Sequence, residues 1–275
     1  MRERGTILIT GCSSGIGACC AHGMKARGWR VFATAREPED IEQLRAAGLD
    51  ALYLDYAEDE SIAAALESVL AATGGRLDAL FNNGAYAQPG ALEDLTTEVL
   101  KEQFDANFFG WHALTRRVVP VMRRQKAGRI VMNSSVLGFI ALRFRGAYTS
   151  TKFALEGYSD TLRIEVERAG IHVATIEPGP IATRFTETAL RYAQKNLPIE
   201  TSVHREAYRR RLASMAKGGN TRGQLGPEAV LDALVHACES GRPRTHYYVT
   251  QPTRLMAFAR RVLPRSTLHR VLKRG

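Results

Sequence analysis

The chain has 275 residues, 45% of them hydrophobic, and its formal net charge is +10. This length suits one large α/β domain or two small ones, and the apolar share allows a substantial core. No run of about 18 apolar residues occurs, so a membrane-spanning helix is not expected.

The first predicted element, Thr6–Thr10, is a short apolar strand, and a glycine-rich turn follows it at once. A helical pattern then continues to about Arg27. In such a unit, Gly11 allows the tight turn, Gly15 lets the backbone approach a pyrophosphate, and Gly17 permits close helix–strand packing. The order of strand, turn and helix separates a phosphate cradle from an ordinary turn. We therefore predict a dinucleotide site made by Gly11, Ser13, Ser14, Gly15, Ile16 and Gly17.

The second predicted strand, Arg30–Ala35, indicates which dinucleotide is bound. Enzymes that prefer NAD place an acidic side chain at the end of this strand, where it bonds the ribose 2′-hydroxyl. Here Ala35 occupies the expected acid position and Arg36 follows it. Because a guanidinium pairs well with phosphate, we expect NADP(H) to be preferred over NAD(H). A solvated arginine at a strand end is the alternative.

Strand and helix patterns alternate along the rest of the chain. Further strands are expected at 51–54, 79–82, 129–133, 172–176 and 246–249. Helices are expected at 39–47, 59–72, 98–125, 147–169 and 227–240. This alternation predicts an α/β fold of Rossmann type, a doubly wound, seven-stranded parallel sheet with helices on both faces. No linker divides residues 1–251, which we expect to form one domain.

The expected helix 147–169 carries a candidate proton donor, Tyr148. Lys152 lies four residues later and so shares a helix face with it. An ammonium held there would lower the phenol pKa from its usual value of about 10. Ser135, just beyond the strand 129–133, could hold a substrate carbonyl against the same phenol. These three side chains predict carbonyl reduction with the phenol as general acid.

Together these motifs resemble those of the short-chain dehydrogenase/reductase family, in its single-domain branch with Thr-Gly-x-x-x-Gly-x-Gly and Tyr-x-x-x-Lys. The resemblance extends from Thr6 to about Pro252. The stretch Thr151–Gly157 is similar to 17β-hydroxysteroid and retinol dehydrogenase-like members, and to a group of bacterial NADP-dependent aldehyde reductases. The family's Asn-Asn-Ala-Gly element is present as Asn82–Ala85, with its last two residues exchanged. The family spacing assigns the catalytic serine to Ser135.

The resemblance implies roles for further residues. Asp55 would lie near the adenine amine, Asn82 beside the adenosine ribose and Thr183 on the nicotinamide carboxamide. Asn107, in an otherwise apolar part of the helix 98–125, would hold a water that links Lys152 to solvent; a hydrogen-bonded core asparagine is the alternative. The other implied cofactor contacts are Gly84, Tyr148, Lys152, Pro178, Gly179 and Ile181.

The segment from about 181 to 226 has no strand pattern and carries apolar residues at irregular spacing. In this family it would form a movable lid over the substrate pocket, although a helical hairpin packed on the domain would explain the same residues. We expect a hydrophobic carbonyl or alcohol as substrate, bound by Ser135, Tyr148 and Phe185. No zinc-ligand cluster is present, so no metal is expected.

Residues 252–275 form a basic extension with seven arginines and lysines and no acidic residue. An apolar stripe runs among these cations, which suits a helix at an anionic membrane surface or on a partner. A basic helix packed on its own domain or across a dimer is the alternative. Nucleic-acid binding is disfavoured, because no DNA-binding motif accompanies the charge. Family analogy implies a homo-oligomer.

The cysteines and the N-terminus bear on location. The chain has four cysteines, Cys12, Cys19, Cys20 and Cys238. None shows metal-ligand spacing, and their number suits a reducing cytoplasm. The first residues run directly into a strand and leave no room for a signal peptide. We therefore expect a cytoplasmic protein, with peripheral contact at the inner face of the membrane if the extension binds lipid.

Two function classes are open. One is an NADP(H)-dependent oxidoreductase acting on hydrophobic aldehydes, ketones or the matching alcohols. The other is a catalytically silent NADP-sensing or scaffold protein that binds a partner through its basic extension. The first requires an intact set of Asn107, Ser135, Tyr148 and Lys152, and all four are present. An enzyme is therefore the favoured interpretation.

Overall fold

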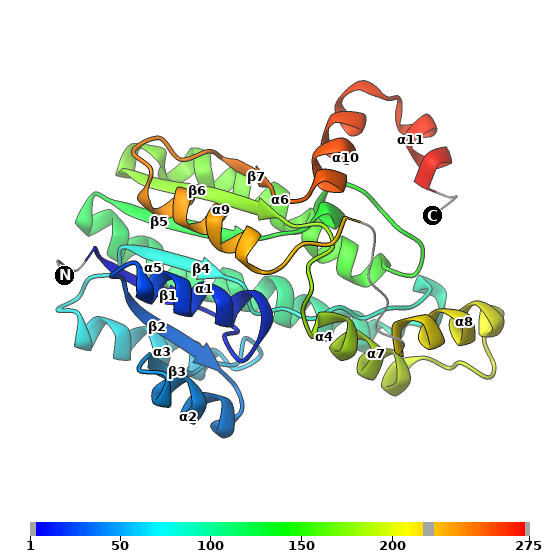
Figure 1. Cartoon of the computed structure of the whole chain (residues 1–275), viewed down its shortest axis with the longest axis horizontal. Coiled ribbons are helices and arrows are strands. Elements are labelled where there is room, and N and C mark those ends of the chain that lie inside the picture. Colours follow the sequence, from blue (N-terminus) through cyan, green and yellow to red (C-terminus); the bar gives the residue numbers. More distant parts are fainter. Residues whose placement is uncertain (1–3, 217–222, 273–275) are drawn as a thin grey trace.

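The structure is a computed structural model that describes residues 4–216 and 223–272. Seven parallel strands form one sheet in the order β3-β2-β1-β4-β5-β6-β7 (Figure 1). The strands are β1 (Thr6–Ile9), β2 (Arg30–Ala35), β3 (Asp50–Tyr53), β4 (Ala79–Asn82), β5 (Gly128–Asn133), β6 (Ile171–Glu177) and β7 (His246–Tyr248). The sequence predicts all seven, and each boundary agrees to within one residue. The predicted seven-stranded parallel sheet is confirmed.

The central strands are apolar along their whole length because helices cover both faces of a parallel sheet. β1 and β4 are buried at every residue. Side chains alternate between the faces, so Ile7 and Ile9 join one core cluster and Leu8 joins the other. These two clusters fix the sheet between two layers of helices.

Helices flank the sheet on both sides, as a doubly wound fold requires. The first face is covered by α1 (Gly15–Ala26), α2 (Pro38–Ala46) and α9 (Glu228–Glu239). The second face is covered by α3 (Asp59–Ala72), α5 (Gly110–Gln125) and α6 (Gly146–Val166). The strand order reverses between β1 and β4, and ligands of such sheets bind at this reversal, beyond the carboxyl ends of the strands.

The segment predicted as one helix over 98–125 is interrupted. It consists of α4 (Thr97–Phe104), a π-helical segment (Asp105–Phe109) and α5. A π-helical turn inserts an extra residue and redirects the side chains on it, and such turns are frequent at functional sites. Here the turn contains Asn107, whose side chain is fully buried.

Two helical pairs lie at the carboxyl end of the sheet (Figure 1). The first is α7 (Phe185–Asn196) with α8 (Arg205–Ala216), and the second is α10 (Gln251–Val262) with α11 (Arg265–Leu272). Of the expected lid 181–226 and extension 252–275, residues 217–222 and 273–275 lie outside the described part, as do residues 1–3. The division at residue 251 stays a prediction. Within the described chain, no helix combines the length and apolarity needed to cross a bilayer.

Candidate active site

The glycine-rich turn is built by close backbone contacts. Gly11 has a φ of +67°, and a Cβ placed on it would lie 2.5 Å from the Cα of Gly84. A Cβ on Gly17 would lie 2.0 Å from the carbonyl oxygen of Gly11. No larger residue fits either contact without moving the backbone. The crowding therefore requires glycine at positions 11 and 17, whereas a Cβ on Gly84 would come no closer than 3.3 Å to its neighbours.

The turn leaves backbone donors at the start of α1. Ser14 is the N-cap residue, and its side chain makes no capping hydrogen bond. The first N–H groups of a helix lack intrahelical acceptors and favour an anion. Thr183 lies across the turn, because a Cβ on Gly15 would be 3.0 Å from the Cβ of Thr183. These uncapped amides and the glycine-lined backbone fit a pyrophosphate, with Thr183 beside it.

Arg36 and Asp55 lie together at the carboxyl end of β2 and β3. The Nη1 atom of Arg36 is 3.6 Å from Oδ2 of Asp55, and the arginine side chain is exposed. Asp55 also accepts a hydrogen bond from the amide of Ala57 (2.9 Å). The guanidinium therefore keeps free donors next to the glycine turn, where a 2′-phosphate could be bound.

Asn82, predicted beside the adenosine ribose, is fully buried at the end of β4. Its oxygen accepts a hydrogen bond from the Tyr56 hydroxyl (2.8 Å), and its amide donates to Oγ1 of Thr115 (3.0 Å). Both polar groups of the side chain are thus used inside the protein. The contact with the ribose stays a prediction that these hydrogen bonds do not support.

Sequence reasoning missed the side chains that support this strand end. The hydroxyl of Thr10 accepts the backbone amides of Asn83 (2.8 Å) and Gly84 (3.1 Å). The Thr10 hydroxyl also lies 2.7 Å from the oxygen of Tyr56, to which it can donate because the Tyr56 proton is used by Asn82. The partial signal was Thr10 itself, which precedes the glycine turn, whereas nothing in the local sequence of Tyr56 indicates this role.

Ser135 and Tyr148 are brought together at the carboxyl end of β5. The oxygen of Ser135 accepts the amide of Leu137 at 3.1 Å, and its side chain lies close enough to the Tyr148 phenol to lower the phenol pKa. Tyr148 lies in the first turn of α6 and is buried. Burial raises its pKa to about 12, while Ser135 and the charge of Arg145 oppose this rise.

Lys152 lies one turn further along α6 and is also buried. Its Nζ donates to the carbonyl oxygen of Asn133 (2.7 Å) and lies 4.4 Å from the Trp111 ring centroid and 5.5 Å from that of Tyr148. Burial lowers the pKa of Lys152 to about 7. The prediction that the Lys152 ammonium lowers the pKa of the Tyr148 phenol is therefore wrong for this structure. Burial disfavours both charged forms, and it dominates.

The side chain of Asn107 makes three hydrogen bonds to two residues. Its oxygen accepts the amide of Tyr86 (3.1 Å), and its Nδ2 donates to the Tyr86 carbonyl (2.8 Å) and to Oγ1 of Thr151 (3.4 Å). Thr151 directly precedes Lys152 on α6. The asparagine thus joins the π-helical segment to the lysine turn, and its role with a water stays a prediction.

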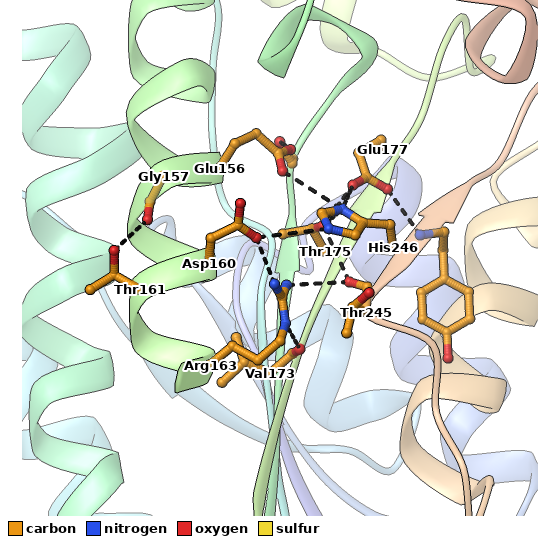
Figure 2. A network of polar contacts seen from close by, with 12 residues as sticks. Glu156, Gly157, Asp160, Thr161, Arg163, Val173, Thr175, Glu177, Thr245 and His246 are labelled. Atoms are coloured by element: carbon orange, nitrogen blue, oxygen red, sulfur yellow. Dashed lines mark hydrogen bonds and ion pairs between the residues drawn. The ribbon is translucent and has the colours of Figure 1, made fainter. Parts of the chain in front are cut away.

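A polar network behind the active-site residues was not predicted (Figure 2). Ser134 donates a short hydrogen bond to Glu156, so the neighbouring serines point to different partners, as strand alternation predicts. Glu177, which is buried, pairs with Nδ1 of His246 at 2.7 Å and accepts the amide of Tyr247 at 2.9 Å. The network joins the end of β5 to α6, β6 and β7.

Tyr148 lies in an apolar cluster, which we call the Tyr148 cluster. Phe185 packs edge-on against it, with 5.6 Å between ring centroids. The buried and half-buried members are Ala87, Val136, Leu137, Phe139, Ile140, Leu142, Tyr148, Phe185, Ala189, Met215, Met256, Ala257, Ala259, Leu268 and Leu272. The predicted substrate residues Ser135, Tyr148 and Phe185 are thus neighbours in an apolar surrounding.

The expected lid is tied to the domain by specific contacts. The phenol of Tyr208 donates to Asp94 (2.5 Å) and accepts the amide of Ala91 (2.8 Å). The main chain pairs at its two ends, where the Ala182 amide donates to the Leu225 carbonyl at 2.8 Å. The described helices α7 and α8 therefore pack on the domain in this structure, and their movement as a lid stays a prediction.

Comparison with known proteins places the chain among oxidoreductases. The family model for short chain dehydrogenase matches residues 5–193. The uncharacterized oxidoreductase YbbO of Escherichia coli (strain K12) is 40% identical over 268 residues, 98% of this chain and 94% of its own length. Human retinol dehydrogenase 8 is 36% identical over 256 residues (86% and 79%). Human 17-beta-hydroxysteroid dehydrogenase type 1 is 31% identical over 260 residues (90% and 78%).

Solved structures agree in fold. A short-chain dehydrogenase from Streptomyces avermitilis has a TM-score of 0.77 and 29% identity, covering 98% of this chain and 96% of that one. Similar enzymes from Burkholderia phymatum with NAD and from Burkholderia cenocepacia with NADP each have a TM-score of 0.76 and 21% identity, covering 93% and 98% of this chain and 92% and 98% of theirs. At that identity the likeness concerns the fold alone.

Proposed function

Because the chain belongs to the short-chain dehydrogenase family of oxidoreductases, we propose that it is an NADP(H)-dependent enzyme that reduces hydrophobic aldehydes or ketones, or oxidises the matching alcohols. The neighbouring side chains of Ser135 and Tyr148, beside an apolar cluster, carry this proposal. A catalytically silent scaffold is disfavoured, because its sequence would not need to retain Asn107, Ser135, Tyr148 and Lys152.

The hydroxyls of Ser135 and Tyr148 would act on the substrate oxygen in different ways. Bound NADPH would supply a hydride to the carbonyl carbon, which builds negative charge on the oxygen. Ser135 already accepts the amide of Leu137, so its hydroxyl hydrogen can be donated to that oxygen. Tyr148 transfers its proton there as general acid. A raised phenol pKa keeps the proton on Tyr148 until the oxygen becomes basic enough to take it.

Lys152 would return the proton to the site. With a pKa lowered to about 7 by burial, its amine can gain and lose a proton near neutral pH. Its contact with the Asn133 carbonyl uses one of its donors, which leaves the others for the site. Asn107 is hydrogen-bonded to Thr151, which directly precedes Lys152. It would hold the water that connects Lys152 to solvent.

The preference for NADP(H) is supported by charge. Arg36 is exposed at the end of β2, and Ala35 takes the place of the acid that would bind a ribose 2′-hydroxyl. Asp55 holds the guanidinium from one side. A phosphate would meet the remaining donors in a charge-assisted contact.

The hydrophobic substrate class is supported by the side chains around Tyr148. Phe185, Leu137, Phe139 and Ile140 belong to the Tyr148 cluster, and transfer of an apolar substrate from water to such a surface is favourable. The names of two relatives point the same way, since retinol and hydroxysteroids are lipophilic alcohols.

The test is turnover of NADPH by the purified chain across a series of aldehydes, from short and polar to long-chain alkyl and aromatic. We expect kcat/KM to rise with apolar length, and Tyr148→Phe to lower kcat by about a hundredfold to ten-thousandfold. Oxidation of the matching alcohols is measured with NADP and retinol or steroid substrates. Undiminished rates in Tyr148→Phe would refute the proton donor.

We further propose a homo-oligomer in a reducing cytoplasm. Exposed apolar side chains on α6, Phe153 (39% exposed) and above all Ile164 (77% exposed), support a contact with a second copy. All four cysteines are free thiols, which suits a reducing compartment.

A further inference from the structure

The inner side of α10 belongs to the active site. Its N-cap residue Thr250 accepts the amide of Thr253 at 3.3 Å, and a Cβ on Gly179 would lie 2.2 Å from the Thr250 hydroxyl. The helix thus begins directly on the Pro178–Gly179 turn. One turn later, Met256 joins the Tyr148 cluster. The extension therefore packs beside the proposed substrate residues and is not only a charged tail.

The outer side of α10 presents an unpartnered apolar stripe. Leu255, Phe258 and Val262 are 61%, 64% and 54% exposed. Their spacing of three and four residues places them on one face of the helix. Bulky apolar side chains grouped in this way mark an interaction surface.

The charge beside this stripe is positive. Arg254 and Arg261 precede Leu255 and Val262 by one position each, and both are exposed. The Arg254 side chain is held outward by a hydrogen bond to the Tyr248 carbonyl (3.0 Å). Arg265 continues the positive charge into α11, and no acidic residue occurs between 252 and 275. Among the residues that the structure describes, these arginines form no ion pair with a carboxylate.

We propose that this face of α10, which we call the α10 face, docks on an anionic lipid bilayer, so that a lipophilic substrate enters the Tyr148 cluster from the membrane. A stable protein contact buries about 800 Å² on each partner, more than a single helix stripe supplies. A bilayer makes no such demand, because apolar side chains insert below the headgroups and arginines bind their phosphates. The delivery of substrate rests on the proposed function, whereas the docking does not.

Vesicle sedimentation tests the docking. The full chain should pellet with vesicles of phosphatidylcholine and phosphatidylglycerol, and much less with phosphatidylcholine alone. Leu255→Gln with Phe258→Gln and Val262→Gln should lower the partition coefficient by about tenfold or more, and Arg261→Gln with Arg265→Gln by a similar factor. The control is Val203→Gln, which changes an apolar side chain that is 86% exposed on the loop before α8.

Several outcomes would overturn the docking. Equal pelleting of the triple variant and the original chain would do so, as would equal binding to both kinds of vesicle. A fall in oligomeric mass in the triple variant, measured by sedimentation velocity, would assign the α10 face to a second copy of the chain instead. Unchanged helicity and thermal midpoint of the triple variant exclude misfolding as the cause of lost binding.

Activity with two substrate presentations tests the delivery. The triple variant should keep kcat/KM for a short water-soluble aldehyde and lose about tenfold for a long-chain aldehyde dissolved in anionic vesicles. Equal rates on the vesicle substrate would overturn the delivery. If the original chain turns over neither aldehyde yet still binds anionic vesicles, the proposed function fails while the docking stands.

Discussion

At the scale of single residues, burial decides the charge states of Tyr148 and Lys152, the proposed catalytic pair. An ammonium one helical turn from a phenol favours the phenolate in water-like surroundings. Here Tyr148 and Lys152 are both buried, the phenol pKa is raised and the amine pKa is lowered. Both groups are therefore held nearer to their neutral forms, which suits a proton that is handed over only when negative charge develops on the substrate.

Arg36→Asp should separate the two cofactors. Loss of a charge-assisted contact with the 2′-phosphate should weaken NADPH binding by about tenfold to a hundredfold, while the new carboxylate can bond a ribose hydroxyl and leave NADH unharmed. Dissociation constants for both dinucleotides, measured by fluorescence, provide the readout. Arg242→Asp, on the exposed loop before β7, is the charge-matched control. Equal losses for both cofactors would count against the phosphate contact.

At the scale of elements, the glycine turn and the helix that follows it act as one unit. Gly17→Ala should destabilise the fold by about 1–3 kcal/mol and impair dinucleotide binding, because the new Cβ meets the Gly11 carbonyl at 2.0 Å. Gly157→Ala on α6 is the matched control, since nothing described lies within 4 Å of its Cβ. It should stabilise the helix by about 0.5–1 kcal/mol. Urea denaturation measures both changes, and equal effects would show that the turn is not crowded.

The ends of β5, β6 and β7 are joined to α6 by the network around Glu156. Burial and the charge of Glu177 raise the pKa of Glu156 from 4.5 to about 7. The pKa of His246 is raised by its hydrogen bond to Glu177. The folded state therefore binds more protons than the unfolded state here. The extra protons bound by the folded state contribute to stability at low pH, and this contribution is lost as the pH rises through about 7.

Glu156→Gln should remove part of this dependence. The free energy of unfolding of the original chain, relative to the variant, should fall by about 1–3 kcal/mol between pH 5 and pH 8. Lys152 titrates in the opposite sense in both proteins, and the variant also lacks the Glu156 charge that raises the pKa of Lys152. Glu165→Gln, exposed on the same helix, is the control. A difference that does not change with pH would disprove the raised pKa of Glu156.

At the scale of the whole molecule, exposed apolar surface remains on α6 after the fold is complete. Ile164→Asp should lower the association constant of the proposed homo-oligomer by about tenfold or more, because a charge is costly inside an apolar contact. Sedimentation velocity across a concentration series provides the readout. Val203→Asp introduces the same charge on the loop before α8 and should have no effect. An unchanged mass for Ile164→Asp would exclude this face of α6 from the contact.

The architecture could be predicted from the sequence because its signals are local. Apolar runs of strand length alternate with longer helical patterns, and the length of each run separates buried parallel strands from helices. The same holds for the glycine turn and for the positions of Ser135 and Tyr148, which follow from the spacing of motifs along one chain. Arg36 at the end of β2 also belongs to this class.

Tertiary structure decided what depends on contacts between distant segments. The side chain of Asn107, in the π-helical turn, is hydrogen-bonded to the backbone of Tyr86. The network around Glu156 of α6 needs Glu177 from β6 and His246 from β7. The placement of α10 beside Tyr148 depends on the Gly179 turn. The pKa values follow burial, which periodicity indicates only coarsely. The sequence by itself therefore determined the order of elements and the chemistry available, and the packing of remote segments decided the charge states and the surfaces.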